Sequence, residues 1–534
     1  MLTSLQHALR MIKAGLVLAQ YDVLVPSEFA DQVPPAARYI SRLARRWAGR
    51  FGPQRANIAD TSPGRRLALA LQALGPAYIK LGQFLATRPD LIGAELAADL
   101  RYLQDRLPPF ATAQAKAIIE AELGVSSDEL FDEFSDPVAA ASIAQVHRAR
   151  IRHTDKDTEQ LTHVAVKVLR PGIEQALAKD LGAFGWAARM AERHWPSMKR
   201  LEPVKLIDTL RDSMTIEMDL RLEAAAASEL KENDAPRDML RIPTIDWRRT
   251  SRRVLTAEWI DAIPIGNLEA LKAANIDTGK IAADVVQVFL TQALFDGFFH
   301  ADMHQGNLFV DQESQLVAVD FGIMGRLDPD TRRYLAEILL GFLSRDYQNL
   351  ADIHIAAGYV PSGKSRDAFA QALRSVGEPI FGRNASEISM ARLLAQLFQI
   401  TDSFDMHLQP QLVLLQKTMV VVEGVARSLD PDLNIWEVSR PIVTQWMEDH
   451  MSPEARIREA AQGAASLGRT LSQLPEALRN AEAIGAMMRR DGLRLHPETA
   501  KAIAMADREQ NKTVRVAVWV GAVALAVIAL AAVF

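Results

Sequence analysis

The chain has 534 residues, of which 49% are hydrophobic and 24% are charged, and its formal net charge is −5. Such a length allows two domains, or one large domain with additions. The slightly acidic balance gives no reason to expect a nucleic-acid-binding protein, which usually presents a basic face. Because the sequence contains no cysteine, disulfides, thiolate zinc sites and thiol chemistry are excluded.

The beginning of the chain is predicted to be helical. Apolar residues recur at helical spacing from Leu2 to Leu16. Arginines between Arg38 and Arg50 then form a basic stretch. Two interpretations of this stretch stay open: a helix face exposed to water, and a surface that contacts an anionic membrane. A secretory signal is not expected, because the apolar run is short and no small-residue cleavage site follows it.

The pattern changes in the centre of the chain. Residues 138–151 and 162–172 are rich in β-branched side chains and are separated by a polar segment, which predicts a β-hairpin. Helical periodicity returns over residues 206–232 and, after a strand at 316–319, over most of the C-terminal third. We therefore expect a mixed α and β centre with helices added on both sides.

The end of the chain predicts a membrane anchor. The last 19 residues, Val516–Phe534, carry no charge. As a helix they would span about 28 Å, close to the hydrocarbon thickness of a bilayer. A buried core helix is the alternative, although such a helix rarely lacks a polar face over this length. The basic residues Arg508, Lys512 and Arg515 precede the run, as is typical of a cytoplasmic flank.

Four residues of the central part have the order that phosphoryl transfer requires in kinase-like folds. There, a loop aspartate is followed five residues later by an asparagine, and a DFG aspartate comes shortly afterwards. Here Asp302 is followed by Asn307 and then by Asp320 of a DFG triplet, while Lys167 ends the apolar run VAVK upstream. We predict that Asn307 and Asp320 hold Mg²⁺, that Lys167 contacts phosphates, and that Asp302 faces the acceptor oxygen.

The histidines around Asp302 allow a competing interpretation. His300 and His304 are four residues apart, a spacing that would suit zinc on a helix. The surrounding residues instead predict a loop that runs into a strand, and no third nitrogen ligand is evident. We therefore expect His300 to orient the loop through hydrogen bonds, with catalytic zinc as the alternative.

Two features depart from the pattern of an ordinary protein kinase. Where a glycine-rich loop should cover the nucleotide, Ala139, Ala140, Ala141 and Ser142 occur, and alanine narrows the conformational range of such a loop. No A-P-E triplet and no long activation segment follow Gly322. The platform that docks a peptide substrate is therefore not expected.

The sequence contains six motifs that resemble, in order, those of the UbiB family of atypical kinase-like proteins: KLGQFLATRPDLIG, AAASIAQVHRA, VAVKVLRPG, IEMDLRLEAA, FHADMHQGN and DFG. The resemblance implies an α+β, atypical protein-kinase-like fold with two lobes, and ATP and Mg²⁺ as cofactors. The expected parts are an N-terminal helical region (1–64), a K-x-G-Q helical extension (65–137), a kinase-like N-lobe with an E-x-D helix (138–265), a helix-rich C-lobe (266–510) and the transmembrane anchor (514–534).

The resemblance also implies roles for individual residues. The catalytic group would comprise Asp302, Lys80, Glu217 and Asp219, with the two acids of the E-x-D motif approaching the K-x-G-Q lysine. Lys167 would pair with Glu223. The nucleotide and its metal would be contacted by Ala139, Ala140, Ala141, Ser142, Val146, Lys167, Glu223, Glu258, Ile260, Asn307 and Asp320, of which Asn307 and Asp320 would be the metal ligands.

Helical spacing separates the three acids Glu217, Asp219 and Glu223, which cannot all share one face of a helix. Asp219 and Glu223 are four residues apart and would share one side, while Glu217 would point elsewhere. Two local departures from the family pattern concern loops: Ala144 and Gln305 stand where members often have glycine and proline. They affect loop geometry and remove no charged group.

The function implied by the resemblance is an ATP- and Mg²⁺-dependent accessory protein of ubiquinone biosynthesis at the bacterial inner membrane. It would act on or present prenylated quinone precursors, with its catalytic body in the cytoplasm. Its partners would be these lipids, the anionic membrane and other proteins of ubiquinone biosynthesis. Two alternatives stay open: a nucleotide-regulated lipid-binding scaffold without turnover, and a small-molecule kinase that phosphorylates a lipid head group.

Overall fold

The computed structural model describes residues 2–23, 62–86, 107–155, 158–194, 202–361, 363–381, 403–406 and 410–451, with single positions at 92, 96, 99, 100, 103 and 400. Residues 11–448 form one compact unit. The described residues of a second unit are the first half of α1 (Leu2–Gln20) and the end of α19 (Ile435–Met451).

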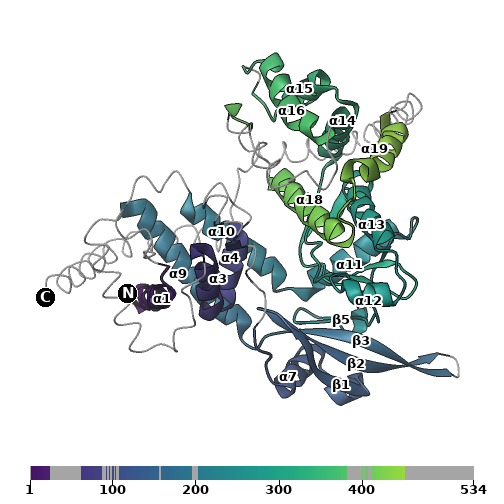
Figure 1. The fold of residues 1–534 in the computed structure, drawn as a ribbon. Coiled ribbons are helices and arrows are strands. Elements are labelled where there is room, and N and C mark those ends of the chain that lie inside the picture. The colour runs from purple at the N-terminus through teal and green to yellow at the C-terminus, as the bar shows by residue number, and fades with distance from the viewer. Residues whose placement is uncertain are drawn as a thin grey trace, which may run out of the picture. The chain divides into compact units, whose positions relative to one another are not determined.

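Helices precede and follow a central group of strands in the described chain (Figure 1). Before and among the strands lie α3 (Pro63–Leu74), α4 (Pro76–Ala86), α7 (Thr112–Leu123), α8 (Ser127–Leu130), α9 (Ile173–His194), α10 (Pro203–Glu217), α11 (Leu220–Asp234), α12 (Leu268–Ala273) and α13 (Thr278–Thr291). After them lie α14 (Pro329–Ser344), α15 (Tyr347–Ala356), α16 (Arg366–Phe381), α18 (Pro410–Leu429) and α19.

The largest sheet has four strands in the order β1 (Glu133–Ala140), β2 (Ala144–Asp155), β3 (Thr158–Leu169) and β5 (Val254–Glu258), each antiparallel to its neighbour. β2 and β3 form the predicted hairpin, in unbroken register from Ala144 opposite Leu169 to Asp155 opposite Thr158 (Figure 1). Its first strand begins at Ala144 and not at residue 138, because residues 138–140 end β1. The polar segment expected to be its loop is largely part of the two strands, because their backbone pairing continues through it.

The alanine-rich segment corrects one prediction. The family pattern predicts a loop from Ala139 to Ser142, but Ala139 and Ala140 are the last residues of β1, where they pair with Val146 and Gln145 of β2. The turn between β1 and β2 is therefore short, from Ala141 to Ile143. The two alanines before it are fixed by backbone pairing in the sheet. Alanine loses less conformational entropy than glycine when it is fixed in a strand, so backbone pairing with β2 can extend β1 to Ala140.

The two faces of β3 differ because side chains alternate across a strand. Val164, Val166 and Val168 are buried in a core shared with α7 and β2. Lys167 lies between them in sequence and points to the opposite face. The apolar run VAVK therefore covers the core with its valines and presents one ammonium group to the rest of the molecule.

The remaining strands form two smaller sheets. One has the order β4 (Leu240–Arg241), β9 (Leu316–Ala318), β8 (Leu308–Val310) and β6 (Ile263–Pro264), and the other pairs β7 (Phe298–His300) with β10 (Met324–Arg326). The hydrogen-bonded strands β7, β8, β9 and β10 bracket two short loops, 301–307 and 319–323. These loops carry the residues for which phosphate chemistry is predicted.

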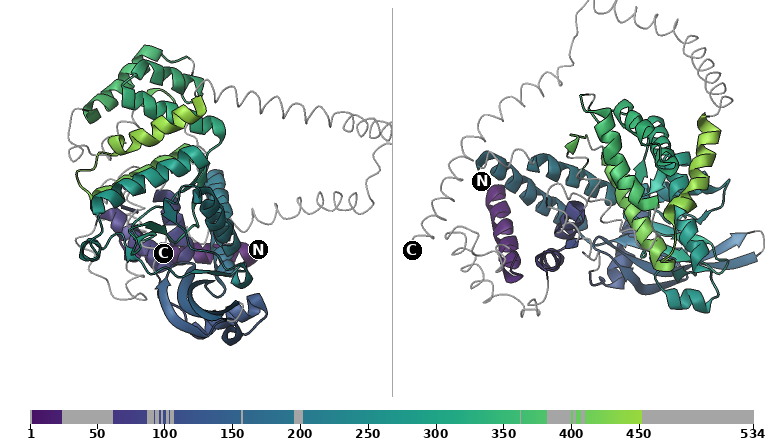
Figure 2. Two further views of the ribbon diagram at one scale, coloured as in Figure 1. Left: turned by 90° about the vertical axis from the view of Figure 1, so that its right-hand side faces the viewer. Right: turned by 45° about the horizontal axis from the view of Figure 1, so that its top comes forward.

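Helical packing surrounds both groups of strands. α3, α4, α9 and α10 share a buried core that also contains Ile143 and Ala144, so the alanine-rich turn packs against the helical extension. Further along the chain, α18 contacts α13, α14 contacts α15, and α15 contacts α16. The green helices of this part lie together in both views of Figure 2.

The predicted anchor, residues 514–534, lies outside the described residues, as does the basic stretch from Arg38 to Arg50. None of the described helices combines the length and the apolar character that crossing a bilayer requires.

Candidate active site

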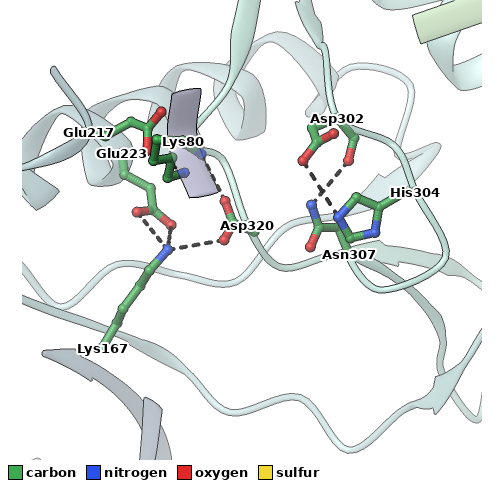
Figure 3. A network of polar contacts seen from close by, with 9 residues as sticks. Lys80, Lys167, Glu217, Glu223, Asp302, His304, Asn307 and Asp320 are labelled. Carbon is green, nitrogen blue, oxygen red and sulfur yellow. Dashed lines mark hydrogen bonds and ion pairs between the residues drawn. The ribbon is translucent and has the colours of Figure 1, made fainter. Parts of the chain in front are cut away.

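Lys167 is the centre of a compact ion cluster. Its position near the end of β3, opposite Val146 on β2 and Leu255 on β5, fixes where its side chain leaves the sheet. Its Nζ donates to both carboxylate oxygens of Glu223, at 2.7 and 2.9 Å, and to Oδ2 of Asp320 at 3.1 Å (Figure 3). The structure thus brings together one residue from β3, one from α11 and the DFG aspartate.

The two carboxylates of the cluster differ in exposure and therefore in what they can do. The side chain of Glu223 is only 9% exposed, whereas that of Asp320 is 43% exposed. Burial raises the pKa of Glu223 more than the Lys167 ammonium lowers it. Glu223 therefore holds Lys167 from the buried side of the cluster, while Asp320 is the acid that a ligand can reach.

The charge states of Lys167 and Asp320 follow from their mutual contact. Burial alone would raise the pKa of Asp320, but the Lys167 ammonium and the backbone N–H of Gly322, which donates to Oδ1 at 3.0 Å, hold it well below its usual range. Burial likewise lowers the pKa of Lys167, and the Asp320 and Glu223 carboxylates raise it more. Both groups are therefore ionised at neutral pH, as phosphate and metal binding require.

The loop after β7 is shaped by its own polar side chains. The backbone N–H of Asp302 donates to Nδ1 of His300 at 3.1 Å. Nδ2 of Asn307 donates to the carbonyl oxygen of Asp302, also at 3.1 Å (Figure 3). His300 is fully buried, and burial lowers its pKa, so the neutral ring can accept this bond. His304 lies at the solvent side, with Nε2 3.5 Å from Oδ2 of Asp302.

The donor set suits magnesium better than zinc. Mg²⁺ binds oxygen ligands, and the carboxylate of Asp320 and the amide of Asn307 supply such atoms from two neighbouring loops (Figure 3). Zinc would use the histidines, but Nδ1 of His300 already accepts a backbone hydrogen bond. Within the described residues, no group of three or more His, Asp or Glu is placed to hold a metal.

A second ion pair joins the K-x-G-Q helix to the E-x-D segment. Nζ of Lys80, on α4, lies 2.5 Å from Oε2 of Glu217 at the end of α10, and the two side chains are 12% and 16% exposed. Nearby, the ring of Tyr78 on α4 meets that of Phe184 on α9 edge to face, with centroids 4.8 Å apart. Charge and packing together hold α4 against α9 and α10.

The E-x-D acids are not on one helix, which corrects the prediction of unbroken helix over residues 206–232. α10 ends at Glu217, and Asp219 is the N-cap of α11, where its carboxylate accepts from the backbone N–H of Arg221. The Arg221 guanidinium also donates to it, at 2.9 and 2.6 Å. Aspartate is a favoured N-cap because its side chain satisfies an orphan amide. Glu217 therefore pairs with Lys80, whereas Asp219 pairs with Arg221.

The alanine-rich turn is held by an arginine that sequence reasoning missed. Arg170 follows β3, and its guanidinium donates to the carbonyl oxygen of Ala141 at 2.7 and 3.0 Å and to those of Leu107 and Pro108 at 3.3 and 2.9 Å. Ser142, next in the turn, is fully buried. Arg170 therefore ties the turn to the helical extension. Its place directly after the apolar strand was the available signal, but nothing in the sequence gave its target.

The segment after β5 is held through Glu258. Its carboxylate accepts from Arg241 at 3.1 Å and from the backbone N–H of Thr244 at 3.2 Å, and these bonds outweigh burial and lower its pKa. Arg241 also donates to Asp311 at 3.0 Å. The predicted nucleotide contact of Glu258 and Ile260 would therefore have to come from their backbone or from the Ile260 side chain.

Exchanging the charges of Lys80 and Glu217 tests their pairing. Each single reversal, Lys80→Glu or Glu217→Lys, should destabilise the protein, because it places like charges together in a largely buried position. The double variant should recover most of the loss, with a coupling energy of about 1–3 kcal/mol in urea unfolding. The same cycle at the exposed pair Lys205 and Glu202 is the control, with an expected coupling of about 0–1 kcal/mol. Equal coupling in both cycles would contradict a structural role for the first pair.

Comparisons with known proteins identify the family of this chain. Residues 102–354 match the model of the ABC1 atypical kinase-like domain, and residues 373–434 match that of the UbiB helical domain. A probable protein kinase UbiB from Marinobacter nauticus is 45% identical over 402 residues, which are 74% of this chain and 72% of that protein. Counterparts from Xanthomonas euvesicatoria and Aeromonas salmonicida are 40% and 39% identical, over 84% and 85% of this chain and 80% and 81% of theirs.

A solved structure is also similar: the complex of Rv3197 with erythromycin from Mycobacterium tuberculosis, at 24% identity and a TM-score of 0.47. It is matched over 67% of this chain and 90% of that chain. The family assignment depends on the sequence relatives, which are similar over most of their length. The chain belongs to the UbiB family of atypical kinase-like proteins.

Proposed function

We propose that this protein binds Mg²⁺–ATP between the Lys167 cluster and the Asp302 loop and breaks the bond to the γ-phosphate. The observation that supports this most directly is the contact of Lys167 with both Glu223 and Asp320, which is the ion arrangement that positions phosphates in kinases. Asn307 and Asp320 would hold the metal, which neutralises charge on the phosphates when it is bound.

The roles of the protein's own residues follow from their exposure and charge. Lys167 stays protonated and can contact phosphate oxygens in the direction of the exposed Asp320, while Glu223 holds it from the buried side. Asp302 lies in a loop with a fixed backbone and can accept the proton of an attacking water or hydroxyl group. No step requires a covalent intermediate on the protein.

The acceptor is proposed to be small. β10 ends at Arg326 and α14 begins at Pro329, so only two residues separate the strand after DFG from the next helix. Protein kinases bind their peptide substrates with a long activation segment at this point. The short connection therefore favours water or a lipid head group over a peptide.

We further propose that this chemistry serves ubiquinone biosynthesis at the bacterial inner membrane. The protein would act on or present prenylated quinone precursors, together with the anionic membrane and other proteins of the same biosynthesis. What supports this is membership of the UbiB family and the uncharged run of 19 residues at the end of the sequence, which is long enough to cross a bilayer.

The test is an assay of the full chain with Mg²⁺–ATP, with and without anionic liposomes and a phenol that resembles the quinone head group. We expect phosphate release that requires Mg²⁺ and rises when liposome and phenol are both present. Mass spectrometry of the same samples detects any phosphorylated phenol, which would mark a lipid head-group kinase. Nucleotide binding without phosphate release or phosphorylated product would refute turnover and indicate a scaffold.

A further inference from the structure

We propose that α18 positions the catalytic loop, and that Thr418 is the residue through which it does so. α18 lies in the helical domain that follows the kinase-like domain, yet its side chains contact the loop on both sides of Asp302. The inference deepens the proposed function, because it assigns a positioning residue to the same site.

Thr418 and His300 hold opposite ends of one peptide plane. The hydroxyl of Thr418 donates to the carbonyl oxygen of Ala301 at 3.1 Å, and the N–H of the same peptide unit, which belongs to Asp302, donates to Nδ1 of His300 at 3.1 Å. A peptide unit is planar, so two bonds at its opposite ends fix its rotation. That rotation sets the direction in which the Asp302 side chain leaves the backbone.

The environment of Thr418 makes this bond difficult to replace. Thr418 is fully buried and Ala301 is 1% exposed, so water cannot substitute for the hydroxyl without a rearrangement. The N–H of Ala301 is also occupied, because it donates to the carbonyl oxygen of Ile323 at 3.0 Å. This bond ties the residue before Asp302 to the loop that follows Asp320.

The hydroxyl of Thr418 has two acceptors for its single proton. Besides Ala301, it lies 2.8 Å from the carbonyl oxygen of Leu414 in its own helix. Bonding to a residue four positions earlier is a common alternative for threonine in helices. A small rotation or shift of α18 would therefore move the proton to Leu414 and release the Ala301 peptide.

A second contact lies on the other side of Asp302. Nε2 of Gln305 donates to the hydroxyl of Ser428 at 2.9 Å, and Ser428 in turn donates to Val425 of its own helix. Thr418 and Ser428 lie about 15 Å apart along the helix axis. One rigid helix therefore contacts the loop both before and after Asp302, so a change in the helical domain is transmitted to the site.

The test compares Thr418→Val, which removes the hydroxyl at nearly constant volume, with Thr418→Ser, which keeps it. In Thr418→Val we expect the Asp302 amide to exchange its hydrogen at least about tenfold faster. ATP turnover should fall about 10- to 100-fold with little change in nucleotide affinity, because misplacement of a reacting group affects the transition state. Thr418→Ser should restore both values to near those of the natural chain.

The control is Thr209→Val. Thr209 is exposed on α10 and also donates to a carbonyl four residues earlier, at 2.9 Å, so it reports the loss of such a bond without any loop contact. If Thr418→Val does not fold, Gln305→Ala removes the other contact from an exposed position and should still accelerate exchange over residues 302–307.

Three outcomes would overturn the inference: unchanged exchange and turnover in Thr418→Val, equal damage by Thr418→Ser, or unchanged exchange in Gln305→Ala when Thr418→Val does not fold. Absence of turnover in the natural chain would refute the proposed function instead. Hydrogen exchange would then still decide whether Thr418 holds the loop.

Discussion

Asp320→Asn is expected to lower ATP turnover by about 10³-fold or more, because it removes the reachable negative charge that would hold the metal. The variant keeps an acceptor oxygen for the N–H of Gly322, so the loop after β9 should retain its shape. Its amide would lie near the Lys167 ammonium, 3.1 Å from the oxygen now present. Phosphate release and nucleotide binding, measured on the same preparation, separate loss of chemistry from loss of affinity.

Asp330→Asn is the matched control for this charge removal. Asp330 is 81% exposed in the first turn of α14 and lies outside the proposed site, so turnover should be unchanged. A scaffold that needs only bound nucleotide would tolerate Asp320→Asn as long as affinity survives. Full turnover in Asp320→Asn would therefore contradict the proposed chemistry, whatever its effect on binding.

Phe299→Ala is expected to have the largest effect on stability, a loss of about 3–5 kcal/mol in the free energy of unfolding. Phe299 on β7 is fully buried, and its ring meets that of Phe289 on α13 edge to face, with centroids 5.9 Å apart. It also lies directly over Gly325 of the paired strand β10, where a Cβ would come within 2.1 Å of the ring. Removing the ring leaves a cavity beside His300, the next residue in the chain.

Urea unfolding measures this loss, and two further variants define its cause. Gly325→Ala should destabilise through crowding, by about 1–3 kcal/mol, since the ring of Phe299 has to move. Leu222→Ala, at a position 49% exposed, should stay within about 0.5 kcal/mol of the natural chain. If Phe299→Ala were no more damaging than Leu222→Ala, the packing between β7 and β10 would not stabilise the protein as described.

Local sequence patterns were sufficient for the strand that carries Lys167 and for the two loops with Asp302 and Asp320. The reason is that each pattern acts over a few residues. Alternation on β3 buries the valines and turns Lys167 to the other face, and the Asp302 loop is closed by Asn307, five residues later. The prediction of a hairpin at β2 and β3 held for the same reason.

Helical periodicity failed where a cap competed with it. Residues 206–232 have a continuous helical pattern, but the side chain of Asp219 satisfies a backbone amide and begins a new helix. The turn at Met218 separates Glu217 from Glu223, so each acid reaches a different lysine. Spacing counted along one helix could not predict this, although aspartate before a leucine-rich segment is a recognised start signal.

The sequence by itself determined which chemical groups are present and which strand or loop carries each of them. These are a strand lysine, a loop aspartate with its asparagine, and a DFG aspartate. Only the tertiary structure decided which groups meet across long separations, such as Arg170 with Ala141 and Thr418 with Ala301. These contacts depend on how helices and strands pack after they form, and a hydrogen bond between distant residues leaves no periodic signal in the chain. The arrangement around Asp302 is therefore set in part by a helix more than a hundred residues further along, at Thr418.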